Sequence, residues 1–314
     1  MPASRPYLLF VRAGGQSLHG RLIAEDPARN WDCCVSWYVP PREESVAEYY
    51  SGGGFNKFEG FVEFWRSAAE LRRYRYILIL DDDIYLPPGE ISRFFRLCDQ
   101  YATYLSQPAL RWFTHTTLNI FVRNPMCVLR RVSFVEVMAP CFSSAALEEL
   151  LHTFGMTKST WGTDLAWGGL LQGRQPIYVV DAVTLLHTRT GGGRPGPFYR
   201  KLEAQGIDPN EELRRVRAQF PDFVGARTLK DGHIYRPGIP PALAPGLMRL
   251  FEKLKFIVRA RKQLARQWRL ARARVEDACT SWATVAALLQ PATLCVTCRR
   301  EHVCLGSLHC ELSR

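Results

Sequence analysis

The feature that most constrains the fold is a run of apolar residues that ends in three consecutive carboxylates, ILILDDDIYL at 77–86. The apolar positions from 76 to 80 are consecutive, which is typical of a strand covered on both faces. Carboxylates at the end of such a strand repel one another, and burial raises the cost of their charge. We therefore expect a cation or a charged substrate beside Asp81, Asp82 and Asp83.

Strand-like and helix-like patterns alternate around this run. Apolar residues at helical spacing predict one helix from Lys57 and another after Pro88. Further strands are predicted at 7–11, 33–39, 134–138 and 177–186. The alternation predicts an α/β fold with a mainly parallel central sheet flanked by helices, and in such sheets ligands gather at the carboxyl ends of the strands.

Composition favours a folded domain. The chain has 314 residues, of which 47% are hydrophobic and 12% aromatic, so a globally disordered chain is excluded. The apolar run from Tyr7 to Val11 is too short for a secretory signal and predicts a first core strand. Five scattered cysteines look like small buried residues in a reducing compartment, which favours the cytoplasm: Cys33, Cys34, Cys98, Cys127 and Cys141.

The three aspartates suggest a metal site. In an extended segment, residues i and i+2 point to the same side, so Asp81 and Asp83 can share one hard cation such as Mg²⁺ or Mn²⁺. That cation would also hold a diphosphate. The alternative is an exposed acidic turn that caps the next helix, because carboxylates favour helix N-termini. The apolar strand before the triplet argues against that alternative.

A second motif is STWGTDLAWGGLL at 159–171. Trp161 and Trp167 can offer flat apolar walls to a sugar ring, and Asp164 between them can act as a general base on a hydroxyl. The alternative is a well-packed turn in which Asp164 caps a helix.

A third motif is the strand-like segment that ends in His187, with Arg189 two residues later. An imidazole can complete a metal site and a guanidinium can bind a phosphate, although a histidine at a strand end is more often structural.

Taken in order, the motifs carry a resemblance. The three aspartates, SQPAL (106–110), FVEVMAPCFS (134–143), WGTDLAWG (161–168) and VVDAVTLLHTR (179–189) resemble the family called domain of unknown function 707, over residues 5–200. That family is similar to nucleotide-sugar transferases of the glycosyltransferase-A type. The resemblance implies a metal-dependent glycosyltransferase that uses a nucleotide-diphosphate sugar and a glycan or lipid-linked hydroxyl acceptor. A single base and direct attack imply inversion.

The resemblance also implies residue roles. Asp81 to Asp83 correspond to a D-x-D element that binds the metal and the donor diphosphate, and His187 completes the metal site. Asp164 stands where such enzymes place the acid that deprotonates the acceptor. The implied nucleotide contacts are Arg12, Gly14, Gly15, Lys57, Asp81, Asp82 and Arg189, and the acceptor contacts are Glu136, Trp161 and Trp167.

Two other function classes stay open. An aspartyl-phosphate hydrolase also places D-x-D after an apolar strand, with the first aspartate as nucleophile. Tyr85 stands where that class expects Thr or Val, and the W-G-x-D segment has no role there. The other alternative is a non-catalytic protein that binds a nucleotide sugar or a glycan, against which Asp164 and His187 argue.

The C-terminal third is basic. Residues 201–314 hold 20 Lys and Arg against 11 Asp and Glu, and most of the net charge of +11 lies there. The segment 253–274 has nine cations, no acid and an apolar stripe at helical spacing. Such a helix binds anionic membrane surfaces or packs on the main domain with its charges solvated. No nucleic-acid-binding module accompanies the charge.

The chain is expected to divide into a catalytic domain (1–240), a basic helical extension (241–290) and a Cys-rich tail (291–314). The uncharged stretch 278–298 is too polar to predict a membrane span. Four cysteines and two histidines between 295 and 310 could bind zinc, but their spacing is tighter than in common zinc sites, and a disordered tail with free thiols is favoured. The expected location is cytoplasmic, with a peripheral position at the inner membrane face left open.

Overall fold

The computed structural model describes residues 5–15, 17–23, 26–38, 47–112, 114, 116, 118–188, 196–255 and 257. The chain divides into two compact units, Met1–Lys253 and Leu254–Arg314. The predictions for Arg189, for the basic helix beyond residue 257 and for the Cys-rich tail concern residues outside the described ones.

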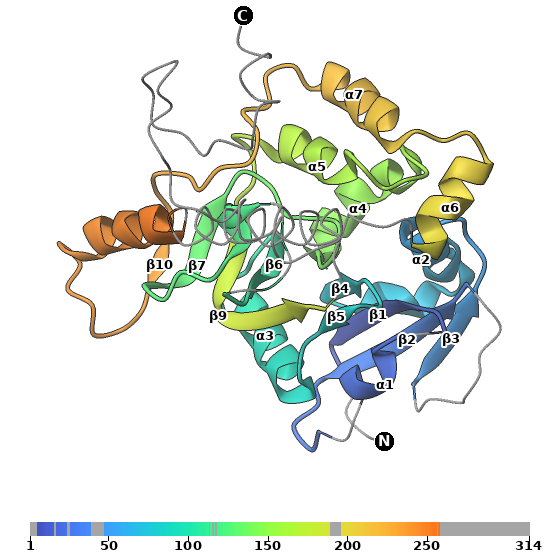
Figure 1. Ribbon diagram of the computed structural model, residues 1–314. Helices are drawn as coiled ribbons and strands as arrows, with labels where there is room; N and C mark the ends of the chain where they lie inside the picture. Colours follow the sequence, from blue (N-terminus) through green and yellow to red (C-terminus); the bar gives the residue numbers. More distant parts are fainter. Residues whose placement is uncertain are drawn as a thin grey trace, which may run out of the picture. The chain divides into compact units, whose positions relative to one another are not determined.

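A ten-stranded mixed sheet runs through the first unit in the order β10-β7-β9-β6-β8-β4-β1-β2-β3, with β5 paired to β9 (Figure 1). The strands are β1 Tyr7–Ala13, β2 Trp31–Trp37, β3 Tyr49–Gly52, β4 Tyr76–Leu80, β5 Ile84–Tyr85, β6 Leu105–Leu110, β7 Cys127–Val132, β8 Cys141–Ser143, β9 Ile177–His187 and β10 Ile234–Tyr235. Strands β3, β2, β1 and β4 are parallel, as are β6 and β9, whereas β8, β7 and β10 pair antiparallel.

Helices flank this sheet, so the predicted α/β class is confirmed; α3 lies below the sheet and α5 and α7 above it in the view of Figure 1. The helices are α1 His19–Leu22, α2 Lys57–Ser67, α3 Pro88–Gln100, α4 Ser144–Leu150, α5 Thr163–Leu171, α6 Pro197–Ala204 and α7 Pro209–Gln219. The short 3₁₀ segments are η1 Ala69–Arg73, η2 Asn119–Phe121 and η3 Leu151–Gly155.

The predicted helix from Lys57 begins there because Asn56 caps it. The Asn56 side chain accepts hydrogen bonds from the amides of Phe58 and Glu59, which satisfies two donors at the helix start. The apolar face of α2 then packs on the core, where the Phe58 ring meets Trp167 edge to face at 5.5 Å. Burying one such aromatic side chain contributes about 1.5–3 kcal/mol.

The predicted strand at 134–138 is wrong, since this segment forms an irregular turn. Its apolar side chains Phe134, Val135 and Met138 are buried as a strand's would be. Its backbone instead bonds locally, with the Ala139 amide donating to the Glu136 carbonyl at 3.4 Å. Hydrogen bonds from Lys57, on α2, and from Asp81, after β4, to the carbonyls of Val137 and Met138 account for the turn.

Strand β9 contains a register shift opposite Pro108. Pro108 pairs with Val180, but the next residue of β6, Ala109, pairs with Thr184. Three residues of β9, Asp181 to Val183, therefore have no counterpart in β6. Proline has no amide hydrogen to donate to a neighbouring strand, which accounts for a break in the ladder at this position.

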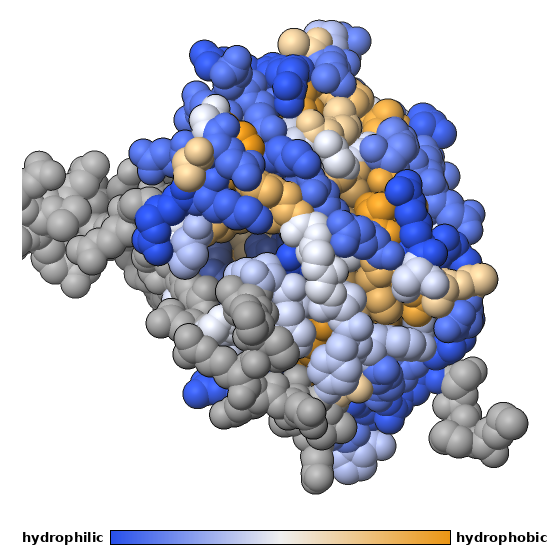
Figure 2. Space-filling view, turned by 90° about the vertical axis from the view of Figure 1, so that its right-hand side faces the viewer, coloured by the Kyte–Doolittle hydropathy of each residue, from blue (hydrophilic) through white to orange (hydrophobic). Residues whose placement is uncertain are grey.

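The described cysteines Cys33, Cys34, Cys98, Cys127 and Cys141 are buried free thiols, as expected of small core residues. Within the described ranges, no helix has the length and apolar character needed to cross a bilayer. The face seen in Figure 2 is mostly hydrophilic, with apolar residues confined to patches.

Candidate functional site

Asp83 and His187 lie together at the carboxyl ends of two strands. Asp83 follows β4, His187 ends β9, and the short strand β5 joins them because Ile84 pairs with His187. The Asp83 Oδ2 atom lies 3.3 Å from His187 Nε2, and both side chains are largely buried. The Thr188 amide donates to the Asp83 carbonyl at 3.0 Å, which fixes the two chain segments. The structure thus brings together two residues that the sequence placed in one metal site.

Lys57 is the cation beside Asp81. Its Nζ donates to Asp81 Oδ1 at 2.6 Å and also to the Val137 carbonyl. The Lys57 side chain is only 6% exposed, so this ammonium is held in one place. Burial raises the pKa of Asp81, Lys57 lowers it and the neighbouring Asp83 raises it. A residue predicted as a nucleotide contact therefore neutralises the first aspartate of the triplet.

The turn at 136–138 connects the donor side of the site to the predicted base. The Asp81 amide donates to the Met138 carbonyl at 3.0 Å, and the Val137 carbonyl accepts from Lys57. The Val137 amide also acts on the Asp164 carboxylate and lowers its pKa. This short turn therefore bonds to Lys57 and Asp81 and influences Asp164.

Asp164 lies in the first turn of α5. Gly162 precedes the helix with φ of +88°, a left-handed conformation that favours glycine. The Asp164 Oδ1 atom accepts a hydrogen bond from the Leu165 amide at 2.9 Å. Burial nevertheless raises the pKa of Asp164 to about 6. A carboxylate with this pKa is ionised at neutral pH and still basic enough to accept a proton from an acceptor hydroxyl.

Glu136 supplies a second carboxyl group to the same place. Its backbone amide donates to the buried Gln107 Oε1 at 2.7 Å, which fixes the start of the turn. Its Oε2 atom is buried and has no hydrogen-bond partner among the described residues. Burial, followed by the charge of Asp164, raises the pKa of Glu136 to about 8, so the group is neutral at pH 7 and can donate a hydrogen bond.

The predicted nucleotide loop is held to its neighbours through Arg12. Arg12 is buried and donates to Ser36 Oγ at 2.8 Å and to the Gly54 carbonyl at 3.0 Å. Burial lowers the pKa of Arg12. The guanidinium therefore fastens β1 to β2 and to the loop before α2, a structural role in place of the predicted nucleotide contact.

Tyr38 covers Gly14 and reaches the middle aspartate. A Cβ on Gly14 would come within 2.4 Å of the Tyr38 hydroxyl oxygen, so only glycine allows this approach. The Tyr38 hydroxyl donates to Asp82 Oδ2 at 2.9 Å, although its side chain is about half exposed. Gly15 beside it is exposed. The sequence signal for Tyr38 was its place at the end of the second predicted strand.

The two tryptophans differ. Trp167 is completely buried, donates to Thr153 Oγ1 at 2.8 Å and meets Phe142 edge to face at 5.1 Å. Its prediction as a wall for a sugar ring is wrong, because both faces of the indole are covered by the core. Trp161 is partly exposed and donates to the Tyr199 hydroxyl at 3.2 Å, so it can still contact a ligand.

The donor set fits part of a divalent-ion site. Among the described residues, no three His, Cys, Asp or Glu side chains converge closely enough to hold a metal. Asp83 and His187, however, are 3.3 Å apart, close to the ~3 Å between adjacent ligands at about 2.1 Å from an octahedral ion. Mg²⁺ commonly takes one or two protein ligands and completes its shell with water and substrate phosphates. Asp81, the predicted third ligand, faces Lys57.

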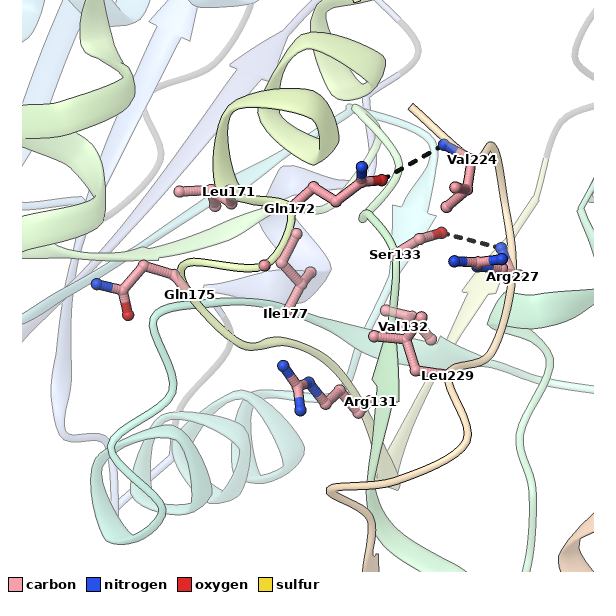
Figure 3. Close-up of a pocket in the computed structure, with 11 residues that line it drawn as sticks. Arg131, Val132, Ser133, Leu171, Gln172, Gln175, Ile177, Val224, Arg227 and Leu229 are labelled. Atoms are coloured by element: carbon pink, nitrogen blue, oxygen red, sulfur yellow. Dashed lines mark hydrogen bonds between the residues drawn. The ribbon is translucent and has the colours of Figure 1, made fainter. Parts of the chain in front are cut away.

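A separate small cavity lies away from these residues, between the end of α5, the start of β9 and residues 224–229 (Figure 3). Its volume is about 50 Å³, and Arg131, Gln172 and Ile177 are among its lining residues. Figure 3 shows Gln172 bonded to the Val224 amide and Ser133 to the Arg227 amide across it. The space suits one or two water molecules, so it offers no room for a nucleotide sugar.

No protein-family model and no curated protein matches this chain. Solved structures similar to it include GalNAc-T7 with UDP, GalNAc and Mn²⁺, at 9% identity and a TM-score of 0.44, covering 70% of this chain and 55% of that one. S. aureus TarS is similar at 11% identity and a TM-score of 0.39, covering 70% and 73%. S. aureus TarS in complex with UDP-GlcNAc is similar at 10% identity and a TM-score of 0.37, and the match covers 68% of this chain and 71% of that one. This chain thus spans about half the length of the GalNAc-T7 chain.

Proposed function

We propose that this chain is a metal-dependent glycosyltransferase that moves a sugar from a nucleotide-diphosphate sugar to a hydroxyl acceptor with inversion. One observation carries the proposal: the turn at 136–138 accepts hydrogen bonds from Lys57 and from the Asp81 amide, and its Val137 amide lowers the pKa of Asp164. A general base with a raised pKa is thereby placed beside a fixed positive charge that suits a diphosphate.

The donor would bind where the aspartate triplet, His187 and Lys57 meet. Asp83 and His187 would hold Mn²⁺ or Mg²⁺, and such an ion supplies positive charge that stabilises the diphosphate leaving group. Asp82, Tyr38 and the glycines at 14 and 15 would contact the nucleotide. Arg189, outside the described residues, stays a predicted phosphate contact.

The acceptor would bind on the Asp164 side. Asp164 takes the proton of the acceptor hydroxyl as that oxygen forms a bond to the anomeric carbon. The bond from the anomeric carbon to the diphosphate oxygen breaks, and its electron pair leaves with the diphosphate. Neutral Glu136 would donate a hydrogen bond to a second polar group of the acceptor, and Trp161 would contact its apolar face.

The test is a thermal-shift screen of nucleoside diphosphates with Mn²⁺, with Mg²⁺ and with excess chelator, because a ligand that binds the folded state raises its melting temperature. We expect a rise that requires the metal and is lost in Asp83→Asn. Asp222→Asn, at an exposed position, is the matched control and should behave like wild type. An equal rise in excess chelator would contradict metal dependence.

The expected location is cytoplasmic, with the basic segment 253–274 at an anionic membrane beside a lipid-linked acceptor. Each cation near such a surface contributes about 1 kcal/mol, screened by salt. The protein should co-sediment with anionic vesicles at low salt and lose this when Arg259, Arg266 and Arg269 become Gln. If the intact protein ignores the vesicles, the segment is better explained as a packed helix.

A further inference from the structure

Two arginines from separate parts of the chain lie beside one turn outside the candidate site, and the charge of a third, Arg93, acts on one of them. Arg93 lies on α3, Arg123 follows η2 and Arg236 follows β10. The Arg123 amide donates to the Leu110 carbonyl at 2.9 Å, and the Arg236 amide donates to the Met126 carbonyl at 3.0 Å. Arg123 and Arg236 thus flank the two ends of one tight turn, 123–126.

That turn is rigidly held. The Asn124 amide donates to Asp181 Oδ1 at 2.8 Å, and the Asn124 side chain donates to Glu252 Oε1 at 2.8 Å. The Asn124 Oδ1 atom accepts from the Met126 amide at 3.1 Å. Asn124 itself is completely buried. The backbone that carries Arg123 and receives Arg236 is therefore held by three hydrogen bonds of Asn124.

Several donor atoms of these two guanidiniums lack partners among the described residues. Arg236 Nε and Nη2 and Arg123 Nε are buried and have no hydrogen-bond acceptor within the described parts of the chain. Burial lowers the pKa of Arg236, the charges of Arg123 and Arg93 lower it further, and Asp181 raises it. Arg93 is exposed, and within the described chain it forms an ion pair with Glu90 at 3.4 Å.

Arg130, a near neighbour, shows what a satisfied buried arginine looks like here. Its Nε and Nη2 bind Asp181 at 2.9 and 3.2 Å, and its Nη2 and Nη1 also donate to the Val122 carbonyl and to Thr228 Oγ1. Asp181 is thereby engaged by Arg130 and by the Asn124 amide. Its hydrogen bonds go to these groups and leave the open donors of Arg123 and Arg236 unbonded among the described residues, and unpaired buried donors destabilise a fold.

We propose that Arg93, Arg123 and Arg236 form a binding site for a phosphate group. A phosphate offers several strong acceptor oxygens to planar guanidinium forks, and arginine is the usual side chain for such recognition. Arg93 at the exposed side leaves the phosphate free to be part of a larger soluble molecule or of a lipid headgroup. The site takes residues from α3 and from the turns beside β7, so it does not depend on the proposed sugar transfer.

The test compares melting temperatures in inorganic phosphate and in chloride at equal ionic strength. Phosphate at about ten times its dissociation constant should raise the melting temperature of the wild type by about 3–6 °C. The rise should vanish in Arg236→Gln and in Arg123→Gln and persist in Arg96→Gln, an exposed residue of α3. In chloride, Arg236→Gln should melt at or above the wild-type temperature, because the change removes a repelled charge.

A phosphate response that is absent in the wild type, or equal in wild type and Arg236→Gln, overturns the proposal. So does a clear loss of stability of both Arg236→Gln and Arg123→Gln in chloride. The source is then separated with phosphatidylcholine vesicles that contain phosphatidic acid. Vesicle binding that Arg236→Gln abolishes assigns the site to a lipid phosphate, and vesicle binding that it leaves unchanged assigns it to a soluble phosphorylated molecule.

Discussion

The first unit contains two places where charges of one sign gather, and they are balanced in different ways. Around the turn at 136–138, carboxylates meet Lys57 and His187, and Glu136 stays protonated at neutral pH. Around the turn at 123–126, Arg123 and Arg236 have buried donors without partners among the described residues, and the charge of Arg93 acts on Arg236. A carboxyl group can relieve repulsion by taking up a proton, whereas arginine cannot lose one in a protein. The acidic region should therefore respond to pH and the arginine region to anions.

The largest expected effect is the loss of Arg130, a fully buried arginine paired with Asp181. Arg130 and Asp181 have no exposed side-chain surface, so Arg130→Met leaves an unpaired buried carboxylate. We expect a loss of about 3–5 kcal/mol in the free energy of unfolding, measured in urea. Arg130→Met with Asp181→Asn should recover most of it, because the amide keeps an acceptor for Asn124. If Arg236→Gln lowered the free energy of unfolding as much as Arg130→Met, the proposed difference between the two arginines would be contradicted.

The next effect concerns chemistry on the acidic side. Asp164→Asn should lower turnover by about 10²-fold or more, since the general base is lost, while donor binding stays within about twofold. Turnover is measured as nucleoside diphosphate released per enzyme, and donor affinity by calorimetry. An Asp164→Asn enzyme with full turnover would reduce Asp164 to a helix-terminal residue, and one that fails to fold would show a structural role.

The pH response of activity follows from the same two carboxyl groups. Turnover should rise as pH increases through about 6, where Asp164 loses its proton, and fall above about 8, where Glu136 loses the hydrogen it donates. The rise of turnover at low pH depends on the protonation of Asp164 alone. A flat profile between pH 5 and 9 with chemistry rate-limiting would contradict both assignments.

The raised pKa of Glu136 should make the folded protein less stable as pH increases. Its pKa in the folded state lies above its ordinary value, so the stabilisation is complete below about pH 4.5 and is lost as pH rises through about 8. Glu136→Gln does not titrate. Its melting temperature relative to wild type should therefore increase by a few degrees from pH 5 to pH 9, measured without metal or nucleotide. Glu211→Gln, on the exposed start of α7, is the control, and parallel curves for both variants would refute the buried neutral carboxyl.

The smallest effect concerns Tyr38. Tyr38→Phe removes one hydrogen bond to Asp82 and keeps the ring over Gly14. A single such bond is worth about 0.5–1.5 kcal/mol, so nucleoside diphosphate affinity should fall by roughly threefold to tenfold. Unchanged affinity would place the nucleotide away from the loop after β1.

Local patterns in the sequence were sufficient for the elements that bound the site. The apolar run at 76–80 is β4, and α2 starts at Lys57 because Asn56 caps it. The run at 134–138 was wrongly predicted as a strand because buried apolar side chains occur equally in a turn. Here the Lys57 side chain and the Asp81 amide, both distant in sequence, bond to the carbonyls of this segment and determine its backbone conformation. Trp167 misled for a related reason, since no local pattern tells an indole in a cleft from one in the core.

Contacts between distant segments account for the rest of the site. The Asp83–His187 pair was expected, but the Lys57–Asp81 pair depends on how α2 docks against β4, which periodicity does not encode. The arginines at 93, 123 and 236 are spread over more than a hundred residues and belong to no sequence motif. Only the fold brings them to one turn.

The register shift in β9 has a consequence for local unfolding. Residues 177–180 are paired on both sides, by β6 and β7, whereas 184–187 are paired by the end of β6 and by the two-residue strand β5. The strand is therefore two short ladders separated by Asp181 to Val183. Amide hydrogens in the first ladder should exchange with solvent more slowly than those in the second, which opens with less structure lost. His187 thus sits on the half of β9 that can fray, whereas Asp181, in the gap between the ladders, is held by its ion pair with Arg130.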